Sequence, residues 1–243
     1  MDQLRSFADE RLVTGCIYCG GAEETREHVP SRVFLNSPLP ENLPVVWACR
    51  SCNNGFSLDE EYLACLIESV IAGSTDPDSI RRPGVANILR RSPALQARIE
   101  AAKSAEDDQI RFGIESDRVS NVLIKLARGH AAFELSQSCR DEPSSIWWHP
   151  IALLSEEQRA SFEASQVAQT FGEIGSRALQ RLLVTQLTLR SATGELSTVD
   201  LLVNDWVDVQ DGHYRYHTID EGDQVSIKIV IGEYLASEVT WKF

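Results

Sequence analysis

The chain has 243 residues, of which 43% are hydrophobic and 24% are charged, and these proportions are typical of a globular protein rather than a disordered one. Lys and Arg number 23 against 36 Asp and Glu, and the net charge of −13 excludes a protein that coats nucleic acid over its whole surface. No run approaches the roughly 20 apolar residues that span a bilayer. The N-terminal sequence also lacks the basic-then-apolar pattern of a signal peptide. We therefore expect a cytoplasmic protein with no membrane partner.

Charge is unevenly distributed along the chain. Residues 1–75 carry a net charge of −6 and residues 131–243 carry −9, whereas residues 76–130 carry +2. A run of basic residues is usually a solvent-exposed face, and contact with phosphate is the alternative. The basic residues in the helical and turn-forming part of this segment are Arg81, Arg82, Arg90, Arg91, Arg98 and Lys103.

A short helix is predicted over residues 2–12, and two Cys-x-x-Cys pairs follow it. Cys16 and Cys19 form the first pair, Cys49 and Cys52 form the second, and 29 residues separate the pairs. Because disulfides are disfavoured in the cytoplasm, we interpret the four thiolates as the tetrahedral ligands of one structural Zn²⁺ ion. A redox-active pair is the alternative, but a redox motif needs only one pair.

An acidic residue and a histidine, Glu27 and His28, lie between the two cysteine pairs and precede Val29-Pro30. Asn53 follows the last cysteine directly, so a zinc-tied frame would gather a carboxylate, an imidazole and an amide in one small volume. This order of motifs resembles the HNH endonuclease family, in particular its zinc-knuckle branch, whose ββα-metal site is built on a treble clef. The resemblance covers residues 14–72, under a third of the chain.

The resemblance implies a role for each of these residues. His28 would be the general base, Glu27 the acidic residue on the metal side, and Asn53 a further ligand of a catalytic Mg²⁺ or Mn²⁺ ion. Oxygen ligands suit Mg²⁺, and a divalent ion on the scissile phosphate stabilises the charge of the transition state. An imidazole with an ordinary pKa of about 6.5 can accept a proton from water at neutral pH.

The chain departs from the family pattern at three places. Glu27 stands where the family more often has Asp. The asparagine that orients the histidine is assigned to Asn42, although it lies seven residues before the second cysteine pair, and Asn36 is the poorer alternative. The lysine that often follows the second knuckle is missing, so Arg32 or Arg50 is expected to contact phosphate instead.

A non-catalytic interpretation of the same residues stays open. Glu27 and His28 would then form a salt bridge in a hairpin of a treble-clef module. Such a module would only bind nucleic acid or a protein, since one fold hosts many functions.

Helices are predicted through the middle of the chain. Ser57 and Glu60 match a capping box at the start of an apolar helical stripe. That helix is expected to end at Gly73, and residues 74–78 form a linker that marks the domain boundary. Further helices are predicted over residues 84–104 with a break near Pro93, over residues 119–130 with His130 in the core, and from Ser155 to about Ala164.

The C-terminal part of the chain is predicted to be mainly β-structure. Asp211-Gly212 predicts a tight hairpin, and residues 225–231 alternate apolar and polar side chains. His213, Arg215 and His217 share one face of a strand, which we expect to be solvated, with a second metal site as the alternative. The strands are predicted over residues 146–150, 182–189, 199–203, 206–209, 213–218 and 225–231.

Together these patterns predict an α+β fold. An N-terminal zinc-bound treble-clef ββα-metal module over residues 1–73 would be followed by a helical and antiparallel-β region over residues 74–243, which would bind substrate or a partner. The predicted function is a metal-dependent HNH endonuclease that hydrolyses phosphodiester bonds in nucleic acid, with DNA favoured. The resemblance implies a restriction or phage-defence setting, with structural Zn²⁺ and catalytic Mg²⁺ or Mn²⁺ as cofactors. A protein partner or a homodimer is left open.

Overall fold

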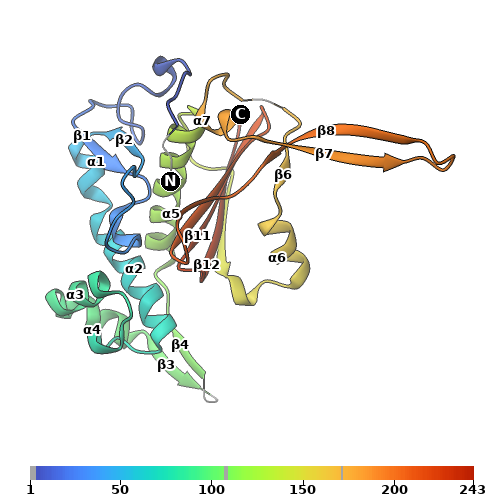
Figure 1. Cartoon of the computed structure of the whole chain (residues 1–243). Helices are drawn as coiled ribbons and strands as arrows, with labels where there is room; N and C mark the ends of the chain where they lie inside the picture. The colour runs from blue at the N-terminus through green and yellow to red at the C-terminus, as the bar shows by residue number, and fades with distance from the viewer. Residues whose placement is uncertain (1–3, 107–108, 171) are drawn as a thin grey trace.

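The computed structural model describes residues 4–106, 109–170 and 172–243 (Figure 1). Helices and antiparallel sheets share the chain, so the predicted α+β class is confirmed. Within these residues, no helix is both long enough and apolar enough to cross a bilayer.

The helices and strands follow one another in chain order. The α-helices are α1 (Arg50–Gly55), α2 (Ser57–Ala72), α3 (Pro83–Arg91), α4 (Pro93–Ala101), α5 (Ser116–His130), α6 (Glu156–Glu163) and α7 (Arg177–Gln180). The strands are β1 (Thr25–His28), β2 (Val45–Ala48), β3 (Lys103–Glu106), β4 (Gln109–Phe112), β5 (Ser145–Pro150), β6 (Gln166–Val167), β7 (Leu183–Arg190), β8 (Leu196–Asn204), β9 (Val207–Gln210), β10 (Tyr214–Asp220), β11 (Gln224–Ile231) and β12 (Leu235–Lys242).

Two antiparallel strands and two consecutive helices form the N-terminal part. β1 pairs with β2 in a register that places His28 opposite Val45. α1 begins two residues after β2, and α2 follows it and ends at Gly73, whose φ of +64° is the left-handed conformation of a helix C-terminus. The hairpin therefore lies beside the helix that carries the second cysteine pair.

The main sheet has the strand order β5-β12-β11-β10-β9, and α5 lies against one of its faces (Figure 1). Tyr214 and Tyr216 both lie on that face, because side chains two residues apart in a strand point to the same side. His130 of α5 stacks on Tyr216 with ring centroids 3.8 Å apart, and its Nε2 lies 2.8 Å from the Tyr214 hydroxyl. The prediction of His130 as a core residue is confirmed.

The opposite face of this sheet is also covered. Phe162 of α6 makes edge contacts with Trp147 and Trp206, each at 5.3 Å between ring centroids. His217 is fully buried beneath this layer, and burial is the main reason that its pKa falls to about 4. The predicted solvated face at His213, Arg215 and His217 is therefore wrong for His217, because side chains of α6 and the segment before β9 cover it.

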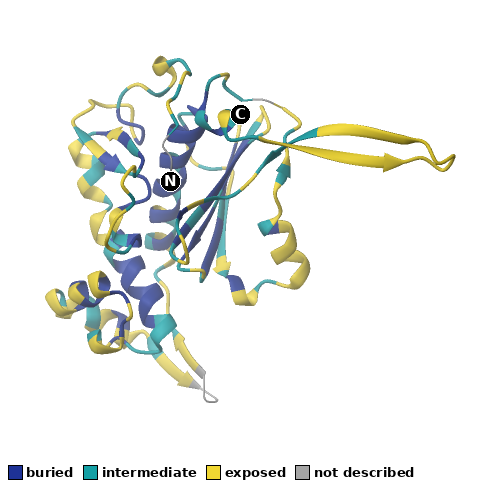
Figure 2. Cartoon of the chain, in the orientation of Figure 1, coloured by how far each residue is buried: buried dark blue, intermediate teal, exposed yellow. Residues whose placement is uncertain are grey.

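One hydrophobic core extends through α2, α5 and the main sheet, as the buried residues in Figure 2 show. Tyr62, Leu126 and Ile229 represent these three elements in it. The helix end at Gly73 lies where the domain boundary was predicted, but the packing continues across this position. The N-terminal helices thus share their core with the C-terminal sheet.

Local capping signals have mixed outcomes. The predicted capping box at Ser57 is wrong: its hydroxyl donates to the Asn54 carbonyl, and Glu60 turns toward Lys125 instead. A buried ammonium binds a carboxylate more strongly than a backbone N–H at a partly exposed helix end does. The capping box at Ser155 is confirmed in both directions.

The remaining differences concern whole elements. The helix predicted over residues 2–12 is wrong for residues 4–9, which are not helical, and a single 3-10 turn begins at Glu10. Residues 2 and 3 lie outside the described part of the chain. The break near Pro93, the helix predicted over residues 119–130 and the hairpin at Asp211-Gly212 are confirmed, and that helix begins three residues earlier, at Ser116. β12 was not predicted, although it pairs with β11 along its full length.

Two helical glycines give opposite stability predictions. A Cβ on Gly129 of α5 would lie 2.8 Å from Val29 Cγ2, whereas a Cβ on Gly84 of α3 would meet nothing within 4 Å. Gly129→Ala should therefore lower the free energy of unfolding by about 1–3 kcal/mol. Gly84→Ala should raise it by about 0.4–1 kcal/mol. Urea denaturation checks both variants, and a stabilised Gly129→Ala protein would contradict the close packing of α5 on Val29.

Candidate functional site

The four paired cysteines converge at one point. The sulfur atoms of Cys16, Cys19, Cys49 and Cys52 all lie within 4.8 Å of one another. Cys19 Sγ and Cys49 Sγ are 3.7 Å apart, close to the edge of about 3.8 Å of a tetrahedron with zinc–sulfur bonds of about 2.3 Å. The cluster could therefore hold a metal ion such as zinc. It is the only group of three or more His, Cys, Asp or Glu with this property among the described residues.

Local backbone structure positions each cysteine pair. The first pair lies in a tight turn, which is closed by two backbone hydrogen bonds. The Gly20 N–H donates to the Cys16 carbonyl at 2.7 Å, and the Cys16 N–H donates to the Gly21 carbonyl at 2.8 Å. Gly20 has a φ of +77°, which favours glycine at this place. In the second pair, Cys49 caps α1 and its sulfur accepts the N–H of Cys52. The pairs thus stand before the β1–β2 hairpin and directly after it.

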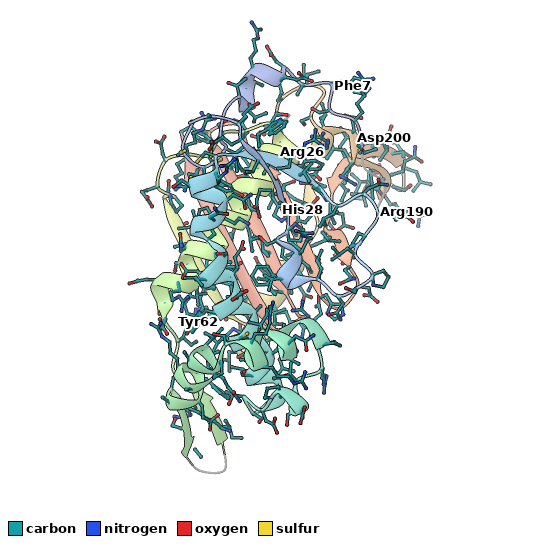
Figure 3. All side chains as sticks on the ribbon, turned by 90° about the vertical axis from the view of Figure 1, so that its left-hand side faces the viewer. Phe7, Arg26, His28, Tyr62, Arg190 and Asp200 are labelled. Atoms are coloured by element: carbon teal, nitrogen blue, oxygen red, sulfur yellow. The ribbon has the colours of Figure 1, made fainter. Side chains whose placement is uncertain are left out.

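Glu27 and His28 occupy adjacent positions of β1, so their side chains point to opposite faces of the strand. Glu27 is only 8% exposed and lies on the inner face. His28 is half-buried on the outer face, which it shares with the exposed Arg26. Figure 3 shows Arg26 and His28 together on one side of the molecule.

A buried ammonium group occupies the inner face. Lys125 of α5 is 1% exposed, and its Nζ donates to Glu27 Oε1 at 2.7 Å and to Glu60 Oε1 at 2.6 Å. The same Nζ donates to the Ser31 hydroxyl, which in turn donates to Glu60. Burial raises the pKa of Glu27, and the nearby Lys125 opposes that rise. This cluster joins β1, α2 and α5 through one cation and two carboxylates.

The three asparagines considered for the site lie in different surroundings. The Asn53 amide donates to the Thr25 hydroxyl at 3.0 Å, which ties α1 to the start of β1. Asn42 is exposed in the turn before β2. Asn36 accepts a bond from Arg82 at 3.0 Å and contacts His213 at 2.9 Å, so it belongs to a different contact with the C-terminal strands.

His28 is suited to accept a proton. Burial lowers its pKa below 6.5, and the positive charges of Arg32 and Lys125 lower it further. The imidazole is therefore neutral at pH 7. Arg26 shares this face of β1 and lies over the Trp47 ring at 5.1 Å from its centroid, and the exposed Arg32 is close enough for its charge to act on the histidine.

The predicted magnesium ligands do not form a prepared site in this conformation. Glu27 is bonded to a buried ammonium, and Asn53 uses its amide N–H on Thr25. A dication beside Glu27 would face the positive charge of Lys125 at short range, which opposes its binding. The assignment of Glu27, Asn53 and Asn42 to a catalytic metal therefore stays a prediction from the resemblance.

The basic segment of the middle region is largely neutralised. Arg82 is buried and donates to the carbonyls of Val33 and Leu35. The expectation of a solvent-exposed face is wrong for Arg82, because these carbonyls and the Asn36 amide satisfy its guanidinium. Arg90 and Arg98 are exposed, and they pair with Asp78 and Glu115, respectively.

Sequence reasoning missed Lys125 and Ser31, and it assigned Glu60 to a capping box. Lys125 is 98 residues from Glu27 along the chain, so no local motif connects them. The available signal was a lysine and a glutamate inside two apolar helical stripes, where charged residues are rarely buried without a partner.

Comparison with known proteins yields no relative. No family model, no curated protein and no solved structure matches the chain. The resemblance to HNH endonucleases therefore depends on the residues of the N-terminal motifs alone.

Metal removal tests the cysteine cluster. Protein purified without chelator should contain one zinc ion per chain, because four thiolates complete a tetrahedral site. A strong chelator should expose the backbone amides of residues 14–56 to hydrogen exchange, since these turns depend on the ion. Atomic emission and exchange mass spectrometry measure the two effects. Absence of zinc, or unchanged exchange after its removal, would contradict the assignment.

Lys125→Met tests the buried cluster. The variant leaves Glu27 and Glu60 buried without their cation and should lose about 3–5 kcal/mol of stability at pH 8. Without Lys125 the pKa of the buried Glu27 carboxyl rises further above its unfolded value, so the folded state binds a proton more readily as pH falls. The loss should therefore be smaller at pH 5 than at pH 8.

The matched control for that variant is Lys242→Met, which removes an exposed lysine and should change stability by about 0.5 kcal/mol or less. Denaturant titrations of both variants at the two pH values give the comparison. An equal loss at pH 5 and pH 8 would mean that the carboxylates are not what Lys125 stabilises.

Proposed function

We propose that the chain is a nuclease of the HNH type that hydrolyses phosphodiester bonds, with His28 as its general base. The observation that carries this proposal is the position of His28, half-buried on the outer face of a hairpin that lies between two metal-binding cysteine pairs. Its lowered pKa keeps the imidazole neutral and able to accept a proton from water. Arg26 and Arg32 offer positive charge to a phosphate close to it.

The arrangement of the cysteine frame supports the same proposal. A cysteine turn, a β-hairpin and a helix that begins with the second cysteine pair follow in the order of a treble clef. Zinc would be structural, because four thiolates leave no open coordination position for substrate. DNA is the favoured substrate, and a restriction or phage-defence role follows from the family resemblance.

A catalytic Mg²⁺ or Mn²⁺ ion is part of the proposal through the resemblance. Glu27, Asn53 and Asn42 are the residues that the family pattern assigns to it or to the orientation of His28. Because Glu27 is paired with Lys125, we assign no step to the metal. The cleavage assay below therefore also measures how the rate depends on added metal.

A second function is favoured by that same ion pair. In a non-catalytic treble-clef protein, Glu27 would hold β1 to α5 through Lys125 and would have no catalytic role. The outer face with Arg26 and Arg32 would then bind nucleic acid or an acidic protein surface without cleaving it.

His28→Ala should reduce cleavage by about 10²–10⁴-fold, because a positioned general base contributes about that factor. Zinc content and the free energy of unfolding should change little, since the side chain makes no hydrogen bond with any of the residues that the structure describes. His149→Ala is the matched control, as it removes an exposed histidine of β5. Cleavage of plasmid, linear and single-stranded DNA, and of RNA, with Mg²⁺ or Mn²⁺ is the measurement.

The pH profile refines this test. The acidic limb of the rate should have its midpoint below pH 6.5, because the folded-state pKa of His28 is lowered. Equal cleavage by His28→Ala and the parent would show that another group is the base. A parent that retains DNA on a filter but cleaves no substrate under any metal condition would establish the binding function instead.

Glu27→Gln separates the two roles of the carboxylate. If Glu27 binds a catalytic metal, the variant should regain part of its activity at raised Mg²⁺ concentration. If Glu27 serves only Lys125, the variant should lose stability while its metal dependence stays that of the parent. Titration of activity with Mg²⁺, beside a denaturation curve, distinguishes these outcomes.

A further inference from the structure

A long two-stranded arm projects from the molecule. β7 and β8 pair with each other from Leu183–Val203 to Arg190–Leu196, and the arm extends into solvent away from the main sheet (Figure 1). Every residue of β7 is exposed, as the colouring in Figure 2 shows. β6 pairs with β8 at Val203 and Asn204, and the Ala168 N–H donates to the Leu202 carbonyl, so these neighbouring contacts support only the base of the arm.

The two faces of this arm differ strongly in polarity. Side chains alternate across a strand, so the register of the two strands defines which residues share a face. One face, here called the apolar face, has six aliphatic residues among its eight members. Its cross-strand pairs are Leu183–Val203, Thr185–Leu201, Leu187–Val199 and Leu189–Ser197. The opposite face has three aliphatic residues among its eight members, from the pairs Val184–Leu202 and Arg190–Leu196, and its other two pairs, Gln186–Asp200 and Thr188–Thr198, are polar.

Such an arm is poorly stable on its own. A two-stranded ribbon in water is marginal unless a third strand or another layer covers an apolar face. Leu183 is 57% exposed and Leu187 is 47% exposed, and both lie on that face. Residues 183–204 also contain no Lys or Pro, the residues that protect open strand edges from pairing. A layer that covers these exposed aliphatic side chains would therefore stabilise the arm.

The charge of the arm argues against nucleic acid as that layer. Residues 183–204 contain one basic residue, Arg190, and two acidic residues, Glu195 and Asp200. A β-ribbon that binds phosphates needs a surplus of Lys and Arg. The arm is also nearly uncharged in a chain of net charge −13. It is therefore a segment where two copies of this chain can approach with little electrostatic repulsion.

We propose that the apolar face is the dimer interface of this protein and that its occupant is the same face of a second copy. In a two-fold arrangement each arm lies antiparallel on the other, with the Leu187–Val199 pair near the axis. Aliphatic side chains of the two faces then interdigitate, as they do between the layers of a β-sandwich. This inference is independent of the nuclease proposal, because it depends on no residue of the N-terminal site.

The available area agrees with an interface of modest strength. β7 has eight residues and spans about 27 Å. Covering eight partly exposed side chains on each copy would bury on the order of 1,000 Å² in total, which is near the lower limit for a specific interface. The dimer should therefore form in the micromolar range and depend on protein concentration.

Sedimentation velocity from about 1 to about 200 μM tests the proposal. The parent should pass from monomer to dimer across this range. Leu187→Thr combined with Val199→Thr should weaken dimerisation at least tenfold, because it removes two central aliphatic side chains while threonine keeps a high strand preference.

The matched control exchanges the neighbouring pair on the opposite face. Thr188→Val combined with Thr198→Val adds apolar surface there and should leave the dimerisation constant unchanged. A control that associates more strongly than the parent would indicate non-specific adhesion and overturn the proposal. A parent that stays monomeric throughout the range would overturn it as well.

Hydrogen exchange shows whether the weakened variant retains its arm. In the parent, the amides of residues 183–204 should become more protected as the concentration rises through the dimer range. In the Leu187→Thr/Val199→Thr variant this concentration dependence should vanish, while the protection that the monomer shows at low concentration remains. Loss of that monomer protection, with dimers still present, would exclude the arm as the interface.

Discussion

One buried ammonium group connects the parts of this protein that are far apart in sequence. Lys125 extends from α5 and binds carboxylates of β1 and α2, which are 98 and 65 residues away. A buried cation without these partners would be strongly unfavourable, and so would the two carboxylates without the cation. The orientation of the hairpin relative to α5, and with it the position of His28, depends on this cluster.

The alternation of side chains along β1 then determines what the site can do. Glu27 faces inward to the cation, and its neighbour His28 faces outward beside Arg26. An inward carboxylate stabilises the hairpin, whereas an outward neutral imidazole is available to substrate. The nuclease proposal and the binding proposal differ in whether His28 acts as a general base and in whether Glu27 also serves a metal. The two proposals agree on the outer face as the place where a ligand binds.

The arm formed by β7 and β8 belongs to a different part of the molecule. It projects from the main sheet on the side away from the β1–β2 hairpin in Figure 1. A chain with a strongly negative charge meets less electrostatic repulsion on self-association where that charge is sparse. Dimerisation through the arm would leave the outer face of β1 open to a long ligand on each copy.

Short-range chemistry made part of this structure predictable from the sequence. The Cys-x-x-Cys spacing, the glycine at the end of α2, the capping box at Ser155 and the Asp211-Gly212 hairpin each involve residues within one turn of the backbone. Their geometry is therefore fixed by local dihedral preferences and neighbouring hydrogen bonds.

Long-range packing decided the rest. Burial of Lys125 with Glu27, of Arg82 with the carbonyls of Val33 and Leu35, and of His217 under α6 joins groups that no local spacing connects. The sequence by itself determined which residues can bind a metal or turn the chain. Only the tertiary structure decided which charged groups are buried and paired, because the cost of removing a charge from water depends on the partners that distant segments bring to it.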